Sequence, residues 1–307
     1  MNFKIKNFLY FLNIQFYNYN SYFKNLKMNI YNFSENKDKI IKFNDNKKFP
    51  IEINKLLIGK FFKKENIGMS SSKILIFEDM VLKIQPTNIE SQNEVKIIKW
   101  LKNCSYFPKI IKYENTNDFS YLLMTKIKGK MSCDETYMTN GNILIKALVD
   151  GLKFLWSFDI SNCPFVQNLN NKIKQIEQKI NKGLINLEDV NLDFFLENKF
   201  QKPKDLLDWL IKNQPKVEEL VLSHGDYCLP NIFINENIFS GFVDIGQLGI
   251  ADKWLDIAIC YRSLKYNVEG KYNGKKYDIN PNFLFNQLKI EPNWDKIRFY
   301  ILLDELI

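Results

Sequence analysis

The sequence predicts an α+β protein with a β-rich N-terminal lobe and an α-rich C-terminal lobe. The first half contains β-like runs such as "KILIF" (73–77) and "MVLKIQP" (80–86), whereas apolar residues recur at helical spacing beyond Asn140. A polar segment, "SHGDYCLPNIF" (223–233), interrupts the helical half between two strand-like runs. With 307 residues, 46% of them hydrophobic, the chain is long enough for two lobes.

The predicted N-terminal lobe covers residues 46–129 and contains a small sheet with one helix. Asn88 can cap this helix, and Ser91 with Glu94 has the spacing of a capping box. The strands of the sheet are expected at 73–77, 80–86, 109–114 and 121–127.

The predicted C-terminal lobe covers residues 130–307. Its helices follow from apolar residues that recur every three to four positions, and Pro203 stands where a first-turn proline is tolerated. The helices are expected at 142–158, 171–183, 203–213 and 294–307.

Residues 1–45 are rich in Asn, Lys, Phe, Tyr and Ile without a clear period, so we expect a poorly ordered extension. Met28 is an alternative start.

Residues 1–64 hold 13 lysines and 4 acidic residues, which leaves 30 basic and 31 acidic residues in the rest. The net charge of +8 therefore belongs to the N-terminal part, and no nucleic-acid partner is expected for the rest of the chain.

The location predicted for the protein is the cytoplasm. The apolar run near the N-terminus is interrupted by asparagines and lacks a small-residue cleavage site, unlike a secretory signal. No segment reaches the roughly 20 apolar residues of a spanning helix, so no membrane partner is expected. The five cysteines are odd in number and form no C-x-x-C pair, which favours buried thiols in a reducing compartment: Cys104, Cys133, Cys163, Cys228 and Cys260.

Three polar residues around the only histidine, His224, form a spaced constellation. Asp226 follows one strand-like run, Asn231 precedes the next, and Asp244 follows a third within "VDIG". Each residue alone is typical of a turn or cap. Together they make an oxygen-rich site that suits Mg²⁺ with phosphate ligands. The order H-G-D-x-x-x-x-N followed by D-I-G is also that of kinases, in which the first Asp is the base.

A second set of residues in the N-terminal half completes such a site. Lys83 lies in a predicted strand and Glu94 on the following helix, and a Lys–Glu pair of this kind can hold nucleotide phosphates. The loop "NIGMSSSKILIF" has one Gly and three serines, of which Ser70 can donate to phosphate oxygens.

These motifs resemble the aminoglycoside 3'-phosphotransferases, the kanamycin-kinase group. The similarity runs over roughly residues 50–307 and rests on "GMSSSKI", "DISNCPF", the long run from "SHGD" to "CYRS", and "NWDKIRFYILLDELI". It implies a bilobal, protein-kinase-like fold and ATP-dependent phosphorylation of an aminoglycoside hydroxyl, the 3'-hydroxyl in the group's name.

The resemblance also implies roles for individual residues. Asp226 would be the base or hydroxyl-orienting residue, while Asn231 and Asp244 would hold Mg²⁺. Lys83 would contact the α- and β-phosphates of ATP and be braced by Glu94. The remaining nucleotide contacts would be Ser70 in the loop and Met124 to Ile127 in the inter-lobe hinge. The expected drug contacts are Asp193, Asp304, Glu305 and the carboxylate of Ile307, which suit a polycationic substrate.

Departures from the family pattern concern substrate choice more than the reaction. Gln247 replaces an Arg after "DIG", Tyr266 replaces an acidic residue, and Val81 stands where some members have an aromatic residue. We expect His224 to be structural, because Asp226 already fills the base role. Trp254 and Asp256 are expected to pack against and anchor the loop that carries Asp226.

Other functions remain open from the residues alone. A kinase of the same fold could act on a macrolide, choline or a sugar. A protein kinase is disfavoured, because eleven residues separate Asp244 from Asp256 and no A-P-E motif follows. The non-enzyme alternative is a binding protein that has lost catalysis and binds nucleic acid or a membrane through its basic tail. The presence of the base and of both metal ligands argues against it.

Overall fold

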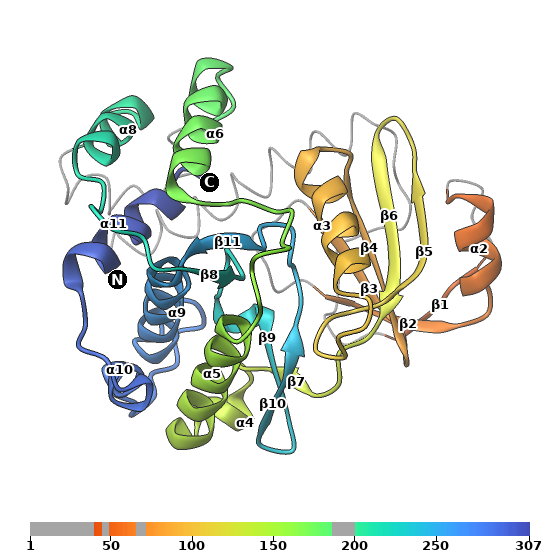
Figure 1. Ribbon diagram of the computed structural model, residues 1–307. Coiled ribbons are helices and arrows are strands. Elements are labelled where there is room, and N and C mark those ends of the chain that lie inside the picture. The colour runs from red at the N-terminus through yellow and green to blue at the C-terminus, as the bar shows by residue number, and fades with distance from the viewer. Residues whose placement is uncertain (1–39, 45–48, 66–71, 186–199) are drawn as a thin grey trace, which may run out of the picture. The chain divides into compact units, whose positions relative to one another are not determined.

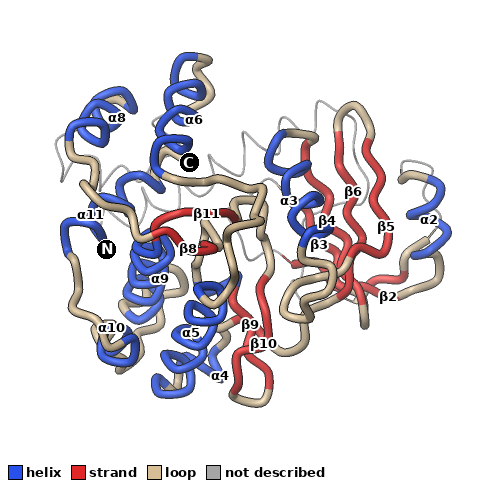
Figure 2. The backbone as a smooth tube through the Cα atoms, in the orientation of Figure 1, coloured by secondary structure: helices blue, strands red, loops and turns tan. Residues whose placement is uncertain are grey.

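The computed structural model of the chain describes residues 40–44, 49–65, 72–185 and 200–307 (Figure 1). The chain divides into two compact units. The first extends to Thr87 and includes Ile111–Met124, and the second comprises Asn88–Ile110 and Thr125–Ile307. Strands predominate in the first unit and helices in the second, as the sequence predicts (Figure 2).

The first unit is built on a six-stranded sheet with the strand order β1-β2-β3-β4-β6-β5. Neighbouring strands from β1 to β4 are antiparallel, and Lys83 of β4 lies opposite Ile74 of β3. The strands are β1 (Ile41–Lys42), β2 (Phe61–Glu65), β3 (Lys73–Ile76), β4 (Met80–Pro86), β5 (Ile110–Asn115) and β6 (Phe119–Thr125), and the short helix α2 spans Ile51–Leu57.

An aromatic cluster forms much of the core of this unit. Phe43 is fully buried, with its ring centroid 5.2 Å from that of Phe49 and 6.1 Å from that of Phe62. Strand β1 and Phe43 fall within the stretch 1–45 that was expected to be a poorly ordered extension. They belong to the core because apolar side chains of the sheet and of α2 surround this ring.

Helix α3 (Ile89–Trp100) begins at the predicted cap, but the capping box is a different one. The Asn88 side chain accepts a hydrogen bond from Ser91 N (2.8 Å), and Ser91 Oγ accepts one from Asn88 N (3.0 Å). The expected Ser91–Glu94 box was wrong, because Ser91 occupies the third helical position and not the cap. The contacts of α3 group it with the second unit, whereas the sequence-based boundary at residue 129 places it in the first lobe.

The second unit contains the remaining helices and two small sheets. The sheets have the orders β10-β9-β7 and β11-β8, and α9 packs against α11 while α5 packs against α10. The strands are β7 (Lys130–Met131), β8 (Leu220–Ser223), β9 (Ile232–Asn235), β10 (Ile238–Phe242) and β11 (Gly249–Asp252). The helices are α4 (Glu135–Met138), α5 (Gly141–Trp156), α6 (Leu169–Asn181), α8 (Pro203–Lys212), α9 (Lys253–Val268), α10 (Phe283–Leu288) and α11 (Trp294–Asp304).

The four helices predicted for this half correspond to α5, α6, α8 and α11. The last one ends at Asp304 and does not continue to Ile307. Helix α9, which the sequence analysis did not delimit, is buried along most of its length. A helix surrounded by protein loses the one-sided apolar pattern that makes a surface helix easy to predict.

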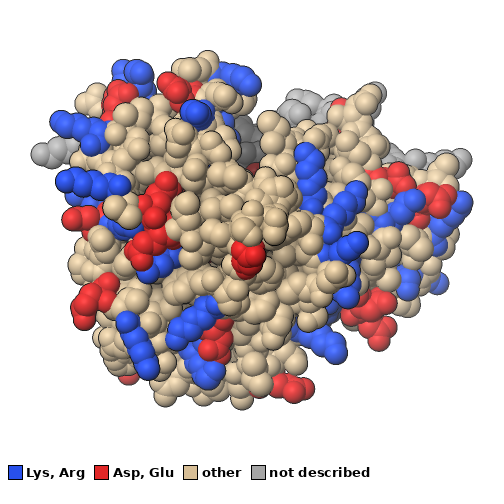
Figure 3. Space-filling view, viewed as in Figure 1, with Lys and Arg blue, Asp and Glu red and all other residues tan. Residues whose placement is uncertain are grey.

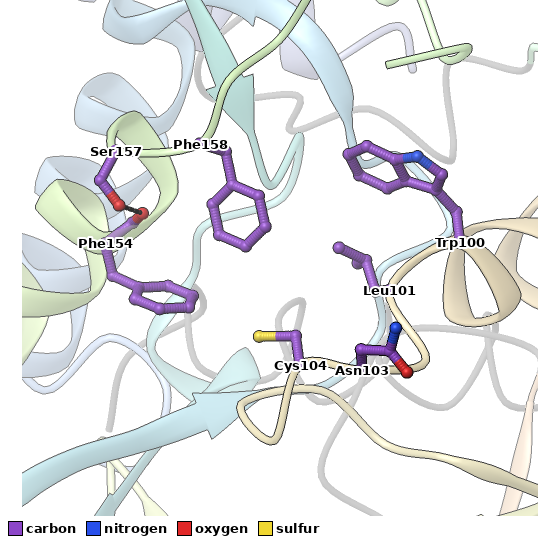
Figure 4. Close-up of a pocket in the computed structure, with 7 residues that line it drawn as sticks. All are labelled: Trp100, Leu101, Asn103, Cys104, Phe154, Ser157 and Phe158. Atoms are coloured by element: carbon purple, nitrogen blue, oxygen red, sulfur yellow. Dashed lines mark hydrogen bonds between the residues drawn. The ribbon is translucent and has the colours of Figure 1, made fainter. Parts of the chain in front are cut away.

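A hollow of about 620 Å³ lies in the second unit between the end of α3 and α5 (Figure 4). The side chains of Leu101, Phe154 and Phe158 approach it, and Ser157 Oγ donates to Phe154 O (2.7 Å). None of the predicted catalytic or metal-binding residues lines this hollow.

Basic and acidic side chains both occur over the face of the second unit seen in Figure 3. The expectation of buried cysteines holds only in part. The five cysteines are free thiols, but only Cys163 and Cys260 are buried, while Cys104, Cys133 and Cys228 are half-buried because they lie in turns and loops. Among the described residues, no helix has the length and apolar character needed to cross a membrane.

Candidate active site

The segment that carries Asp226 turns sharply between β8 and a single 3-10 turn, Leu229–Asn231. Gly225 makes this turn possible. Its φ of 85° favours glycine, and a Cβ at this position would lie 2.4 Å from the carbonyl oxygen of Gln247. The loop therefore packs directly against the backbone that follows "VDIG", and a larger residue would push the two segments apart.

Asp256, on the first turn of α9, anchors the same loop from below. Its carboxylate accepts hydrogen bonds from His224 N (2.8 Å) and Gly225 N (3.0 Å), and its side chain is fully buried. Burial raises the pKa of this carboxyl to about 6, while the two backbone donors oppose the increase. The expected anchoring role of Asp256 is confirmed.

Trp254 stands beside Asp256 in the same helical turn. Its indole Nε1 donates to Glu219 Oε1 (2.8 Å), and its side chain is buried. This contact ties α9 to the start of β8, in agreement with the expected packing role.

His224 is buried and neutral. Asp226 N donates to His224 Nδ1 (3.3 Å), so the ring proton must lie on Nε2, which donates to Val243 O (3.1 Å). Burial lowers the pKa of His224 to about 4. The histidine thus connects the two segments that bear Asp226 and Asp244, and a ring fixed in this way is structural rather than a base.

We expect His224 to make stability dependent on pH. Its folded-state pKa of about 4 lies below the ordinary 6.5, so its stabilising effect is complete above pH 6.5 and is lost as the pH falls towards 4. The stability advantage of the wild type over His224→Gln, which does not titrate, should shrink by about 3 kcal/mol between pH 7 and pH 4. Urea unfolding at a series of pH values measures this difference, and a constant difference would contradict the prediction.

Asp226 and Asn231 are in direct contact. Asn231 Nδ2 donates to Asp226 Oδ2 (2.9 Å) and to the carbonyl oxygen of Asp226 (3.0 Å). Burial, together with the charges of the Asp304 and Asp244 carboxylates, raises the pKa of the Asp226 carboxyl to about 7. A carboxyl with a pKa near neutrality, held at a fixed orientation, suits a general base.

Asp244 follows β10 in the left-handed conformation, with a φ of 57°. Non-glycine residues rarely adopt this conformation, and aspartate tolerates it better than most. The preceding residue, Val243, donates from its N–H to Asn231 O (3.0 Å), so the backbones of the two predicted metal ligands are linked. This arrangement brings Asp226, Asn231 and Asp244 together, as the sequence predicts.

The donor chemistry of this group fits a magnesium ion. Carboxylate and amide oxygens are the hard ligands that Mg²⁺ prefers, and it needs few of them from the protein when phosphates and waters supply the rest. Among the residues described, no set of three or more His, Cys, Asp or Glu side chains is arranged to hold a metal. Asn231 and Asp244 stay the ligands that the sequence predicts.

Asp304, the last residue of α11, and Glu305, which follows it, lie at an ion-pair cluster. Arg262 of α9 contacts Asp304 and, through Nη1, Glu305 Oε1 (3.1 Å), and all three side chains are largely buried. Lys179 Nζ donates to the carbonyl oxygen of Ile307. Sequence reasoning missed Arg262, although it is one of only two arginines in the chain.

Lys172 of α6 was also missed. Its side chain is buried, and Nζ has no hydrogen-bond partner among the described residues. Burial lowers the pKa of Lys172 to about 8, while the charges of Asp304 and Asp256 oppose this decrease. A lysine in an apolar helical stripe resembles any surface lysine, so no local signal could have found it.

The predicted nucleotide contacts are distributed over both units. Lys83 on β4 and Met124 on β6 are buried in the first unit, whereas Glu94 on α3 and Ile127 are buried in the second. The chain passes from the first unit to the second directly after Met124, as expected of a hinge segment. Two further predicted site residues, Ser70 and Asp193, lie outside the described residues.

Comparison with known proteins identifies the family of the chain. Residues 67–278 match the phosphotransferase enzyme family. An aminoglycoside 3'-phosphotransferase of Enterococcus faecalis is 32% identical over 266 residues, which cover 83% of this chain and 97% of that protein.

Solved structures give the fold. An aminoglycoside-3'-phosphotransferase of type VIII matches with a TM-score of 0.66 at 20% identity, over 80% of this chain and 94% of that one. An aminoglycoside phosphotransferase of Streptomyces rimosus, solved with ADP and streptomycin, matches with a TM-score of 0.64 at 19% identity, over 80% and 92% of the two chains. The predicted bilobal, protein-kinase-like fold is confirmed. Given the family match over residues 67–278 and the identity to the Enterococcus protein, the chain belongs to the phosphotransferase enzyme family, among the aminoglycoside 3'-phosphotransferases.

Proposed function

We propose that this protein transfers the γ-phosphoryl group of ATP to the 3'-hydroxyl of an aminoglycoside and thereby confers resistance to the antibiotic. The observation that carries the proposal is the geometry of Asp226, a carboxyl with a pKa of about 7 held by the Asn231 amide. The Enterococcus relative supports the acceptor, and the Streptomyces structure with ADP supports ATP as the donor.

In this reaction Asp226 orients the acceptor hydroxyl and takes its proton. The hydroxyl oxygen forms a bond to the γ-phosphorus, the bond from that phosphorus to the bridging oxygen of ADP breaks, and the proton moves to a carboxylate oxygen of Asp226. Asn231 fixes the carboxylate through its hydrogen bond to Oδ2. Since phosphoryl transfer has a loose transition state, positioning and electrostatics supply most of the catalysis.

Asn231 and Asp244 would hold Mg²⁺, which supplies positive charge to the β- and γ-phosphate oxygens when bound. Lys83, supported by Glu94, would hold the α- and β-phosphates, and Ser70 would donate to phosphate from its loop. Met124 and Ile127 would flank the adenine. The free thiols suit a reducing cytoplasm, where we place the reaction.

The direct test incubates purified protein with Mg-ATP and a panel of aminoglycosides, and follows ADP release. We expect drug-dependent turnover with 3'-hydroxylated drugs and not with 3'-deoxy analogues, and NMR of the product identifies the modified hydroxyl. Macrolides, choline and simple sugars form the comparison panel for the alternative kinase functions. Turnover with one of these and with none of the aminoglycosides would overturn the proposal.

Our candidates for contacts to the drug remain Asp304, Glu305, the carboxylate of Ile307 and Asp193. We expect Asp304→Asn to raise KM for the aminoglycoside at least about 10-fold, because hydrogen bonds between charged groups contribute about 1.5–3 kcal/mol. The KM for ATP should stay unchanged. Steady-state kinetics of both substrates measures the effect.

Asp295→Asn is a matched control for this variant, since Asp295 lies exposed on the same helix and the charge change is identical. Equal KM values for the aminoglycoside in the two variants would remove Asp304 from the drug site.

A further inference from the structure

Tyr266 and Tyr272 follow Arg262 in the chain and contact each other. We call this pair of rings the aromatic corner. Their ring centroids are 6.0 Å apart, and the rings meet edge to face at 62°. Tyr266 lies four positions after Arg262 on α9, so the two side chains share one face of the helix. The aromatic corner therefore continues the same surface that carries the ion pairs to Asp304 and Glu305.

Tyr272 is the more exposed ring of the corner. Burial of part of its phenol raises the pKa to about 12, with smaller contributions from Cys228 and Glu305 and with Arg262 opposing the increase. The Cys228 thiol is in turn hydrogen-bonded to Asp226. Even so, 57% of Tyr272 is exposed to solvent, so the ring remains accessible to a ligand.

The backbone holds this ring in place without help from a ligand. Tyr272 lies in a turn between Gly270 and Gly274, whose φ angles of 75° and 76° favour glycine. Gly274 N donates to Gly270 O (2.8 Å), and Lys271 N donates to Tyr266 O (2.9 Å). A turn tied to the end of α9 in this way presents the ring at little entropic cost to binding.

Tyr266 already accepts a cation on its face. The ammonium group of Lys271 lies 3.8 Å from the centre of the Tyr266 ring and 3.5 Å from Glu269 Oε2. Attraction of an ammonium by the quadrupole of an aromatic ring contributes about 0.5–1 kcal/mol at exposed sites and about 2 when water is excluded. The corner thus has the chemistry for binding protonated amines, and Arg262, one helical turn before Tyr266, pairs with the carboxylates of Glu305 and Asp304.

We infer that Tyr266 and Tyr272 form the side of the acceptor site that receives a protonated amino group of the aminoglycoside by cation–π contact. The inference rests on the proposed function and specifies how the polycationic substrate is bound. An aromatic ring attracts the ammonium without adding another negative charge to a region that already contains Asp226, Asp304 and Glu305.

The test replaces each ring by leucine and by phenylalanine. Tyr272→Leu and Tyr266→Leu should raise KM for the aminoglycoside roughly 3- to 30-fold, with smaller changes in kcat and no change in KM for ATP. The phenylalanine variants keep the ring and should restore KM to within about twofold of the wild type. Tyr277→Leu is the control, because the Tyr277 ring faces Lys275 in the same loop region and lies outside the corner.

Binding of two aminoglycosides that differ by one amino group replaced by a hydroxyl provides a second readout. Calorimetry should show a preference for the additional amine in the wild type, and this preference should shrink in Tyr272→Leu or Tyr266→Leu. Unchanged KM values and preferences in both leucine variants of an active enzyme would overturn the inference, as would phenylalanine variants as weak as the leucine ones. If the wild type phosphorylates no aminoglycoside, the proposed function fails instead.

Discussion

Replacing Asp226 by alanine is expected to lower kcat by about 10²- to 10⁴-fold, the range for losing a general base. His224 does not take over this role, because its imidazole is neutral and both of its ring nitrogens are engaged. The Asn231 amide would lose one of its two acceptors and keep only the backbone carbonyl oxygen of residue 226, so the orientation of a candidate metal ligand would be less fixed. Coupled measurement of ADP release at saturating ATP and aminoglycoside gives the value.

The same variant should not unfold the protein. In the wild type, the half-buried carboxyl of Asp226 is repelled by the charges of Asp304 and Asp244, a placement that costs folding free energy. Removing it relieves this repulsion, so we expect Asp226→Ala to melt at the same temperature as the wild type or higher. Asp150→Ala, at a partly exposed position paired with Lys146, is the control and should keep full activity. An Asp226→Ala enzyme within tenfold of the wild type would rule out the assigned base.

Asp256→Ala is expected to lower the free energy of unfolding by about 2–4 kcal/mol. The carboxylate accepts two buried backbone donors, His224 N and Gly225 N, and each buried donor left without a partner costs about 1–3 kcal/mol. Part of this cost is offset, because removing a fully buried carboxylate also removes its own desolvation penalty. Urea unfolding should show a lower midpoint at an unchanged slope.

Two further variants test whether the loss of stability comes from the hydrogen bonds of Asp256. Asp256→Asn retains one oxygen acceptor and should lose roughly half as much stability as Asp256→Ala. Asp208→Ala removes an exposed carboxylate on α8 and should change stability by less than about 0.5 kcal/mol. Activity should also fall in Asp256→Ala, since the loop that holds Asp226 loses its support. Equal stability of Asp256→Ala and Asp208→Ala would contradict the anchoring role.

Local patterns explain why much of the fold could be predicted. The helices at 142–158, 171–183 and 203–213 were found because their apolar residues repeat with the period of a helix, which needs no knowledge of distant contacts. The capping box at Asn88 was misplaced by one turn because Ser91 can either cap a helix or occupy its third position. Short-range sequence does not distinguish these two uses.

Local sequence likewise predicts one part of the candidate site and misses another. Asp226, Asn231 and Asp244 lie within 19 consecutive residues, so short strands and turns are enough to bring them together, and their spacing already predicted the chemistry. Arg262 meets Asp304 across 42 positions, through the packing of α9 against α11. The burial of Lys172 and the neutral state of His224 likewise arise from surrounding residues that are distant in sequence. Reaction chemistry is thus visible in local spacing, whereas substrate contacts, pKa values and anchoring depend on long-range packing, because burial and electrostatic fields are sums over the whole folded chain.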